Sequence, residues 1–308
     1  MKKLFFVLQF TLFLLFNFFL LITAYQLLSA PGAMKRLGYN EPKYNNKEDY
    51  DPALSRLNTI NKVSAYCDSL YAEKTYTDNT IKFEESYPIL AANVVRQRFY
   101  HGYSLYGFSN NFMAMMLEHI STEGLSAIVI PDDILEYPYA ACSQQSIVLM
   151  EILKRKGFSS RKVGFKGKKG GHFCYEVYYN GAWHFYDTDM EPDVAVLNAY
   201  NHPGIDYLSR NPNILLAAYH QYPKETVLDI FTHYSYGKVN TFAAPRAIIF
   251  QKITKVLSYF TWLLFLLLFI FARRKYLRYS RQHVRNNRIH FPRLQPGTAS
   301  IYYPNYSA

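Results

Sequence analysis

The chain contains 308 residues, half of them hydrophobic, and it carries a formal net charge of +11 and three cysteines. Lys2, Lys3 and the eight Lys or Arg residues after Ala272 hold ten of these charges, which leaves only +1 for the rest. A nearly neutral central region lacks the excess of positive charge that is typical of a nucleic-acid-binding protein. Three cysteines are too few for a disulfide scaffold.

The segment Leu4–Leu28 is predicted to be a membrane span that makes residues 1–28 an N-terminal anchor. It contains no charged residue and exceeds the roughly 20 residues that cross a bilayer. A cleaved signal peptide is the alternative, because Lys2 and Lys3 form a basic start and Ser29–Ala33 is a small-residue patch. The apolar core of a signal peptide usually has about 7 to 15 residues, so this longer stretch favours an uncleaved anchor.

Helical patterns follow as far as residue 119. Asp51 before Pro52, with apolar residues at helical spacing, predicts a capped helix over residues 52–73. A second helix is expected over about residues 86–100, ending before Gly102, and a third over residues 111–119.

From Cys142 the pattern changes to one helix and three short β-rich segments. The helix is expected over residues 142–156, because Gly157 stands at the position of a helix stop. The last two β-rich segments are separated by Asn180-Gly181, which is the strongest short-range signal for a hairpin with a type I′ turn. A helix feeding an antiparallel sheet predicts an α+β domain. The expected strands are 160–165, 172–179 and 182–187, and further helices are expected over 213–221 and 224–234.

A second apolar stretch, residues 253–272, is predicted to be a transmembrane helix. Its centre, residues 259–271, is free of charge, and the stretch is followed at once by the basic tail 273–308, which contains no acidic residue. Positively charged flanks remain in the cytoplasm, so both ends of the chain are expected there. Residues 29–252 would then form one exported domain with its core at 86–192, whether or not the first segment is cleaved. The protein is thus expected to be a multi-pass protein of the cell (inner) membrane with its domain on the periplasmic side.

Cys142 is the candidate nucleophile, because a helix start favours the reactive thiolate. With a two-residue turn, strand pairing places Cys174 opposite Asp187 and His172 opposite Asp189. His172 and Asp187 then become diagonal neighbours on one face of the sheet. A carboxylate at that distance can orient the imidazole, which can take and return the thiol proton.

These motifs resemble the transglutaminase-like superfamily. The segments are Ala141–Gln145, Gly171–Tyr178 and Gly181–Asp187, within a stretch of about 50 residues from Pro138 to Met190. Members place Cys at a helix start, His on a strand before a Glu-Val-like pair, then a Gly-x-Trp turn and Asp fifteen residues after the His. The resemblance implies a papain-like fold, thiol-mediated acyl transfer on an amide, and Cys142, His172 and Asp187 as the catalytic triad.

A departure from the family pattern favours hydrolysis of a protein or cell-wall peptide, by a peptidase or amidase, over protein cross-linking. Both tryptophans lie after Cys142, whereas animal transglutaminases use a tryptophan before the nucleophile near the oxyanion. Two other readings stay open: a catalytically silent binding module in a membrane assembly, and an arylamine acetyltransferase, which the short Cys-to-His spacing fits less well. The expected partners are the lipid bilayer and a protein or peptide substrate.

For other residues the sequence gives weaker evidence of a role. Asp189 could share the role of Asp187, Cys174 is expected to pack rather than to lock Cys142 in a redox pair, and Glu176 is usually structural in the family. The backbone N–H of Cys142 is one oxyanion donor by geometry. The other histidines show no metal-ligand spacing, and no cofactor or metal is implied. Candidates for a side-chain oxyanion donor are Gln97, Tyr100 and His101.

Overall fold

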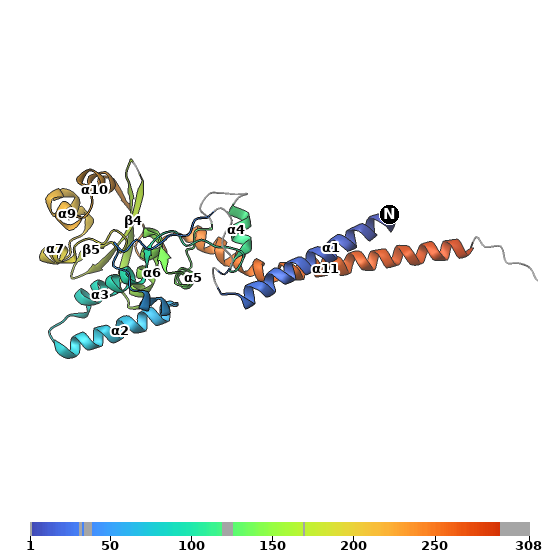
Figure 1. Ribbon diagram of the computed structural model, residues 1–308, viewed down its shortest axis with the longest axis horizontal. Coiled ribbons are helices and arrows are strands. Elements are labelled where there is room, and N and C mark those ends of the chain that lie inside the picture. Colours follow the sequence, from blue (N-terminus) through green and yellow to red (C-terminus); the bar gives the residue numbers. More distant parts are fainter. Residues whose placement is uncertain (1, 31–32, 34–38, 119–125, 169, 290–308) are drawn as a thin grey trace, which may run out of the picture. The chain divides into compact units, whose positions relative to one another are not determined.

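The computed structural model describes residues 2–289 apart from 31–32, 34–38, 119–125 and 169. The chain forms two compact units: residues 1–24 with 259–308, and residues 25–258, which we call the domain. The domain combines helices with an antiparallel sheet (Figure 1), which confirms the predicted α+β class. The tail from residue 290 onward, including Arg293, and Pro31 and Gly32 of the small-residue patch lie outside the described residues.

The sheet has the strand order β5-β4-β3-β6 and is antiparallel throughout. Asn180 and Gly181 have φ angles of 49° and 77°, as a type I′ turn requires, so the hairpin prediction is confirmed. The edge strand β6 was not predicted, because it lies at the end of the segment 224–234 that was expected to be helical. The strands are β3 (Ser159–Lys166), β4 (Gly171–Tyr179), β5 (Ala182–Tyr186) and β6 (Tyr234–Tyr236).

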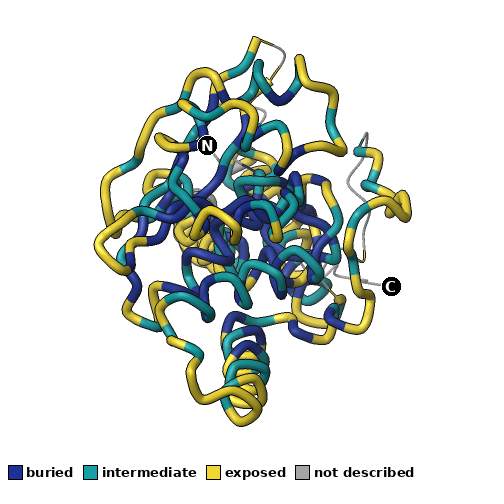
Figure 2. The backbone as a smooth tube through the Cα atoms, turned by 90° about the vertical axis from the view of Figure 1, so that its left-hand side faces the viewer, coloured by how far each residue is buried: buried dark blue, intermediate teal, exposed yellow. Residues whose placement is uncertain are grey.

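Side chains alternate across β4 and enter two hydrophobic cores. Tyr175 and Val177 join the core on the side of α6 (Cys142–Arg155), whereas Cys174 joins a core built with four short helices. Figure 2 shows the buried stretches in the interior and the exposed ones around them. The four helices are α7 (Val194–Ala199), α8 (Ile205–Arg210), α9 (Pro212–Ala218) and α10 (Lys224–Phe231). β4 is therefore buried on both faces.

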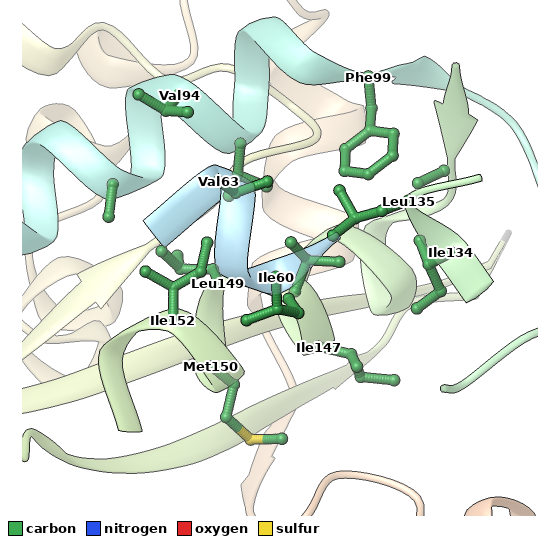
Figure 3. Close-up of a cluster of buried hydrophobic side chains, with 14 of the residues drawn as sticks. Ile60, Val63, Val94, Phe99, Ile134, Leu135, Ile147, Leu149, Met150 and Ile152 are labelled. Atoms are coloured by element: carbon green, nitrogen blue, oxygen red, sulfur yellow. The ribbon is translucent and has the colours of Figure 1, made fainter. Parts of the chain in front are cut away.

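The first core holds the helices that position Cys142. Ile60 and Val63 of α2 (Ile60–Thr77) and Val94 of α3 (Phe83–Arg98) meet α6 there (Figure 3). The prediction of a single helix over residues 52–73 is wrong. A 3-10 turn, Pro52–Arg56, comes first, and Thr59 then caps the separate helix α2. The side chain of Thr59 accepts from an N–H of the first turn and Asp132 accepts the N–H of Ile60, so α2 has its own N-terminus.

Two short strands lead into the nucleophile helix. β1 (Tyr100–His101) pairs in parallel with β2 (Tyr139–Ala140), so that His101 lies opposite Ala140, two residues before Cys142. The sequence did not predict this pairing, because the partners lie about forty residues apart and each strand is too short to show a period. The pairing places the chain after α3 alongside the start of α6. Two further helices occur here, α4 (Phe112–Glu118) and α5 (Pro131–Ile134).

Arg98, in the last turn of α3, is 1% exposed, and its guanidinium is held by carbonyl oxygens. It donates to Leu57, Ser55, Tyr137 and Leu135 over 2.6–3.4 Å. Burial lowers the pKa of Arg98 to about 10, so the side chain remains charged at neutral pH. This one side chain therefore ties α3 to the 3-10 turn and to the segment before β2.

The last helix, α11 (Pro245–Ile289), begins within the domain and continues past its boundary at Ser258. Gln251 receives the N–H of Val129 at 2.9 Å and donates to the carbonyl of Ala127 at 2.7 Å. Lys255 pairs with the buried Asp133 at 2.7 Å. The domain thus extends six residues beyond the predicted boundary at residue 252, because this stretch of the helix carries polar side chains that bind it.

The other unit contains α1 (Lys2–Leu28) up to Ala24 and α11 from Tyr259. Two helical segments are long and apolar enough to cross a membrane, Lys3–Leu28 and Pro245–Gln282, and few of their apolar residues are buried. Aromatic rings join the two helices in antiparallel register. These pairs are Phe5–Tyr279, Phe13–Phe269 and Phe19–Phe265.

His202 gives the domain a pH dependence that can be measured. Burial lowers the pKa of His202 to about 4, below the ordinary value of 6.5. The unfolded chain takes up this proton as the pH falls through about 6.5, whereas the folded chain does so only near 4. The stability that His202 contributes is therefore complete above pH 6.5 and is lost as the pH falls toward 4, by about 2 kcal/mol at pH 5.

We expect His202→Asn to remove this contribution and to flatten the fall in Tm between pH 7.5 and pH 5 by about 6 °C. Asparagine also tolerates the φ of 50° at this position. Thermal unfolding of both proteins at the two pH values measures the difference. The exposed His220→Asn should keep the parent slope, and an unchanged slope in His202→Asn would contradict the prediction.

Candidate active site

Cys142 is the first residue of α6, and Ala141 before it has extended backbone angles. Its side chain is partly exposed. Gln144, one turn into the helix, accepts the N–H of Ala141 through Oε1 at 3.2 Å, which fixes the chain as it enters the helix. The first N–H groups of a helix have no partner inside it and carry the positive end of its dipole. The thiol therefore lies where a thiolate is stabilised.

His172 connects this thiol to a buried carboxylate. Its Nε2 lies 2.7 Å from Oδ2 of Asp187, and a ring nitrogen of His172 lies within 4.8 Å of Sγ of Cys142. Because Asp187 engages Nε2, Nδ1 is the ring nitrogen left for the thiol. The structure thus brings together the three residues that the sequence singled out.

The charges of His172 and Asp187 stabilise each other. Burial lowers the pKa of His172, but the Asp187 carboxylate beside it raises that pKa to well above 6.5. Burial raises the pKa of Asp187, while His172 and two backbone N–H groups lower it to below its ordinary value of 3.8. At neutral pH the pair is therefore an imidazolium and a carboxylate, and an imidazolium next to Cys142 stabilises its thiolate.

Asp187 is held by more donors than the sequence indicated. Oδ2 also accepts the hydroxyl of Tyr219 at 2.9 Å, and Oδ1 accepts the N–H groups of Asp189 and Met190 at 3.1 Å each. Tyr219 follows α9, far along the chain, and nothing in the local pattern distinguishes it from the other tyrosines of this aromatic-rich sequence. These four donors, His172 included, fix the carboxylate that orients the imidazole.

Asp189 has different partners from those that the sequence suggested. β5 ends at Tyr186, so the ladder does not reach the expected pairing of Asp189 with His172. Asp189 Oδ1 instead lies 2.8 Å from Nδ1 of His101 and accepts Nε2 of Gln145 at 3.1 Å. Asp189 nonetheless stays at the site: one of its carboxylate oxygens, Sγ of Cys142 and a ring nitrogen of His172 lie within 4.8 Å of one another.

Two of the suggested oxyanion side chains are engaged elsewhere. Gln97 donates to Asp49 at 3.2 Å, and the hydroxyl of Tyr100 donates to the carbonyl of Pro42 at 3.3 Å. His101 alone of the three is bonded to a residue of the site. The backbone N–H of Cys142 remains a candidate donor, because it begins the helix.

The other two cysteines and Glu176 have structural surroundings. Burial raises the pKa of Cys67 to about 12 and that of Cys174 well above 9.0, so both remain thiols at neutral pH. Cys174 packs in the second core but also lies close to His172 and Asp187. Glu176, buried on the same strand, pairs with Arg161 at 2.7 Å.

The same side chains could hold a soft divalent metal ion. Cys142, His172 and Asp189 form one group with a ligand atom of each within 4.8 Å of the others, and His172, Cys174 and Asp187 form another. A histidine ligand usually donates its other N–H to a carboxylate, as His172 does to Asp187. The expectation from the sequence that no metal is needed stays a prediction.

Searches of protein-family models, of curated proteins and of solved structures found no significant match to this chain. The resemblance to transglutaminase-like enzymes therefore depends on the motifs around Cys142, His172 and Asp187. The geometry of these three residues is the basis for interpreting the site.

Proposed function

We propose that the domain is a cysteine acyl-transfer enzyme of the transglutaminase-like type, which hydrolyses an amide through a thioester on Cys142. One observation carries the proposal: a ring nitrogen of His172 lies within 4.8 Å of Sγ of the partly exposed Cys142 at the start of α6, and Nε2 of His172 bonds to the buried Asp187. A buried cysteine that only packs has no need of an oriented base or of a helix N-terminus.

The steps follow from this arrangement. Nδ1 of His172 holds the proton taken from Cys142, and the thiolate attacks the amide carbonyl. The C–N bond breaks as the imidazolium gives its proton to the leaving amine, and the acyl group remains on sulfur. Water then attacks the thioester and releases the acid and the thiol. The backbone N–H of Cys142 would stabilise the oxyanion.

We further propose that the enzyme is anchored in the cell membrane with the domain outside the cytoplasm. Two helices with the length and composition of membrane spans support this, together with the basic residues that follow the second one. The substrate class that fits the location is an exported protein or a cell-wall peptide, and the absence of a tryptophan before Cys142 favours hydrolysis over cross-linking.

Alkylation of the full chain in detergent micelles tests the proposal. We expect iodoacetamide to react with Cys142 at pH 6, and His172→Ala to slow that reaction by roughly 100-fold, because a thiol without its imidazolium is protonated there. Mass spectrometry of the modified peptide gives the rate at each cysteine.

The exposed His220→Ala serves as the matched control and should react like the parent. Addition of EDTA should change neither rate, because the proposed reaction uses no metal ion. Equal rates for the parent and His172→Ala would show that the triad does not operate, and would favour a binding module that retains the fold without the reaction.

A further inference from the structure

A second carboxylate–imidazole pair lies beside Cys142. Nδ1 of His101 is 2.8 Å from Oδ1 of Asp189, whose side chain is only 8% exposed, whereas the side chain of His101 is 55% exposed. The pairing of β1 with β2 sets His101 opposite Ala140, two residues before the nucleophile. The pair therefore repeats the relation of His172 to Asp187 at a more solvent-exposed place.

Asp189 is fixed from the nucleophile helix. Gln145, three residues after Cys142, donates through Nε2 to the same Oδ1 of Asp189 at 3.1 Å and to the carbonyl of Ala140 at 3.0 Å. An oxygen of Asp189 also lies within 4.8 Å of Cys142 Sγ and of a ring nitrogen of His172. The carboxylate therefore orients His101 with respect to the thiol, and it leaves Nε2 of His101 as the ring nitrogen that Asp189 does not engage.

Charged side chains surround His101 and shift its pKa. The bond to Asp189 raises the pKa of His101 above 6.5, burial lowers it, and the carboxylates of Asp189 and Glu48 raise it further, while His172 opposes them. Glu48 also accepts the backbone N–H of His101 at 3.2 Å. By contrast, the side chain of His172 is 5% exposed, and its Nε2 is bonded to Asp187.

We infer that His101, oriented by Asp189, is a second catalytic residue that takes the proton of the incoming acceptor when the acyl group leaves Cys142. The inference deepens the proposed function and rests on it. In this step a water proton passes to Nε2 of His101 while the water oxygen attacks the thioester carbonyl. The C–S bond breaks, the electron pair returns to the sulfur of Cys142, and His101 releases its proton to solvent.

The full chain in detergent micelles with p-nitrophenyl acetate separates the two half-reactions. The burst of p-nitrophenolate reports acylation, whose leaving group needs no acid, and the steady state reports deacylation. His101→Asn keeps an amide N–H that can bond to Asp189 but has no titratable nitrogen. We expect its burst rate to stay within about two-fold of the parent and its steady-state rate to fall about 100-fold.

Two further readouts distinguish proton transfer from a structural role. Hydroxylamine, which attacks without a base, should discharge the acyl-enzyme of His101→Asn as fast as that of the parent. In His101→Ala, added imidazole should restore part of the steady-state rate. The exposed His233→Asn is the matched control and should change neither phase.

The inference would be overturned if His101→Asn changed neither phase, or if it slowed the burst and the steady state equally, because the residue would then act in folding or at the oxyanion. If Cys142→Ser released p-nitrophenolate as fast as the parent in both phases, the thioester chemistry of the proposed function would instead be refuted, and the role of His101 would fall with it.

Discussion

Serine at position 142 is expected to reduce acyl transfer by roughly 10⁴-fold or more, the largest effect of any single change in the site. A hydroxyl at neutral pH is far from ionised, and the imidazole of His172 is bonded to Asp187 in a geometry that stabilises a thiolate. Cys142→Ser should therefore fail to form the acetyl-enzyme with p-nitrophenyl acetate. Mass spectrometry of residue 142 and release of p-nitrophenolate measure this loss.

Cys67→Ala is the control, because Cys67 is buried in the first core and lies outside the site. It should lose some stability but retain the acetyl-enzyme. If Cys142→Ser and the parent released p-nitrophenolate at the same rate, the reaction would have to arise from another residue.

Replacement of Arg98 by leucine is expected to lower the free energy of unfolding of the domain by about 3 kcal/mol, or Tm by about 10 °C. The guanidinium donates to four carbonyl oxygens, and leucine leaves these acceptors without a donor in a part of the domain that water does not reach. Removal of a buried charge offsets only part of that cost.

Thermal unfolding followed by circular dichroism measures the loss. Arg155→Leu is the matched control, since Arg155 is 40% exposed and pairs with Glu151 one turn away, and such pairs contribute less than about 1 kcal/mol. A change in Tm no larger than that of Arg155→Leu would show that the carbonyl oxygens find other donors when Arg98 is absent.

Local signals in the sequence were sufficient to predict the central residues of the candidate site. The Asn180-Gly181 turn fixes the register of β4 and β5, and this register brings His172 close to Asp187. A stop at Gly157 and the helical spacing before it located α6 with Cys142 at its first residue. These features depend on residues that are neighbours in the chain or across one hairpin.

The features that escaped prediction depend on distant parts of the chain. Tyr219 reaches Asp187 only because the second core packs α9 against the sheet, and Asp189 meets His101 only because β1 pairs with β2. Likewise, the break before Thr59 arises where Asp132, far along the chain, accepts the first N–H of α2. No periodicity or turn signal records such contacts.

The attachment of α11 to the domain has a practical consequence for expression of a soluble fragment. Asn111 donates to Thr254 at 3.1 Å and accepts from Ser258, also at 3.1 Å, while Lys255 neutralises the buried Asp133. A fragment that ends at residue 252, just before the apolar stretch, would leave these polar groups of the domain without their hydrogen-bond and ion-pair partners. A fragment that ends after Ser258 retains them, and its solubility would then depend on how few of the following apolar residues it includes.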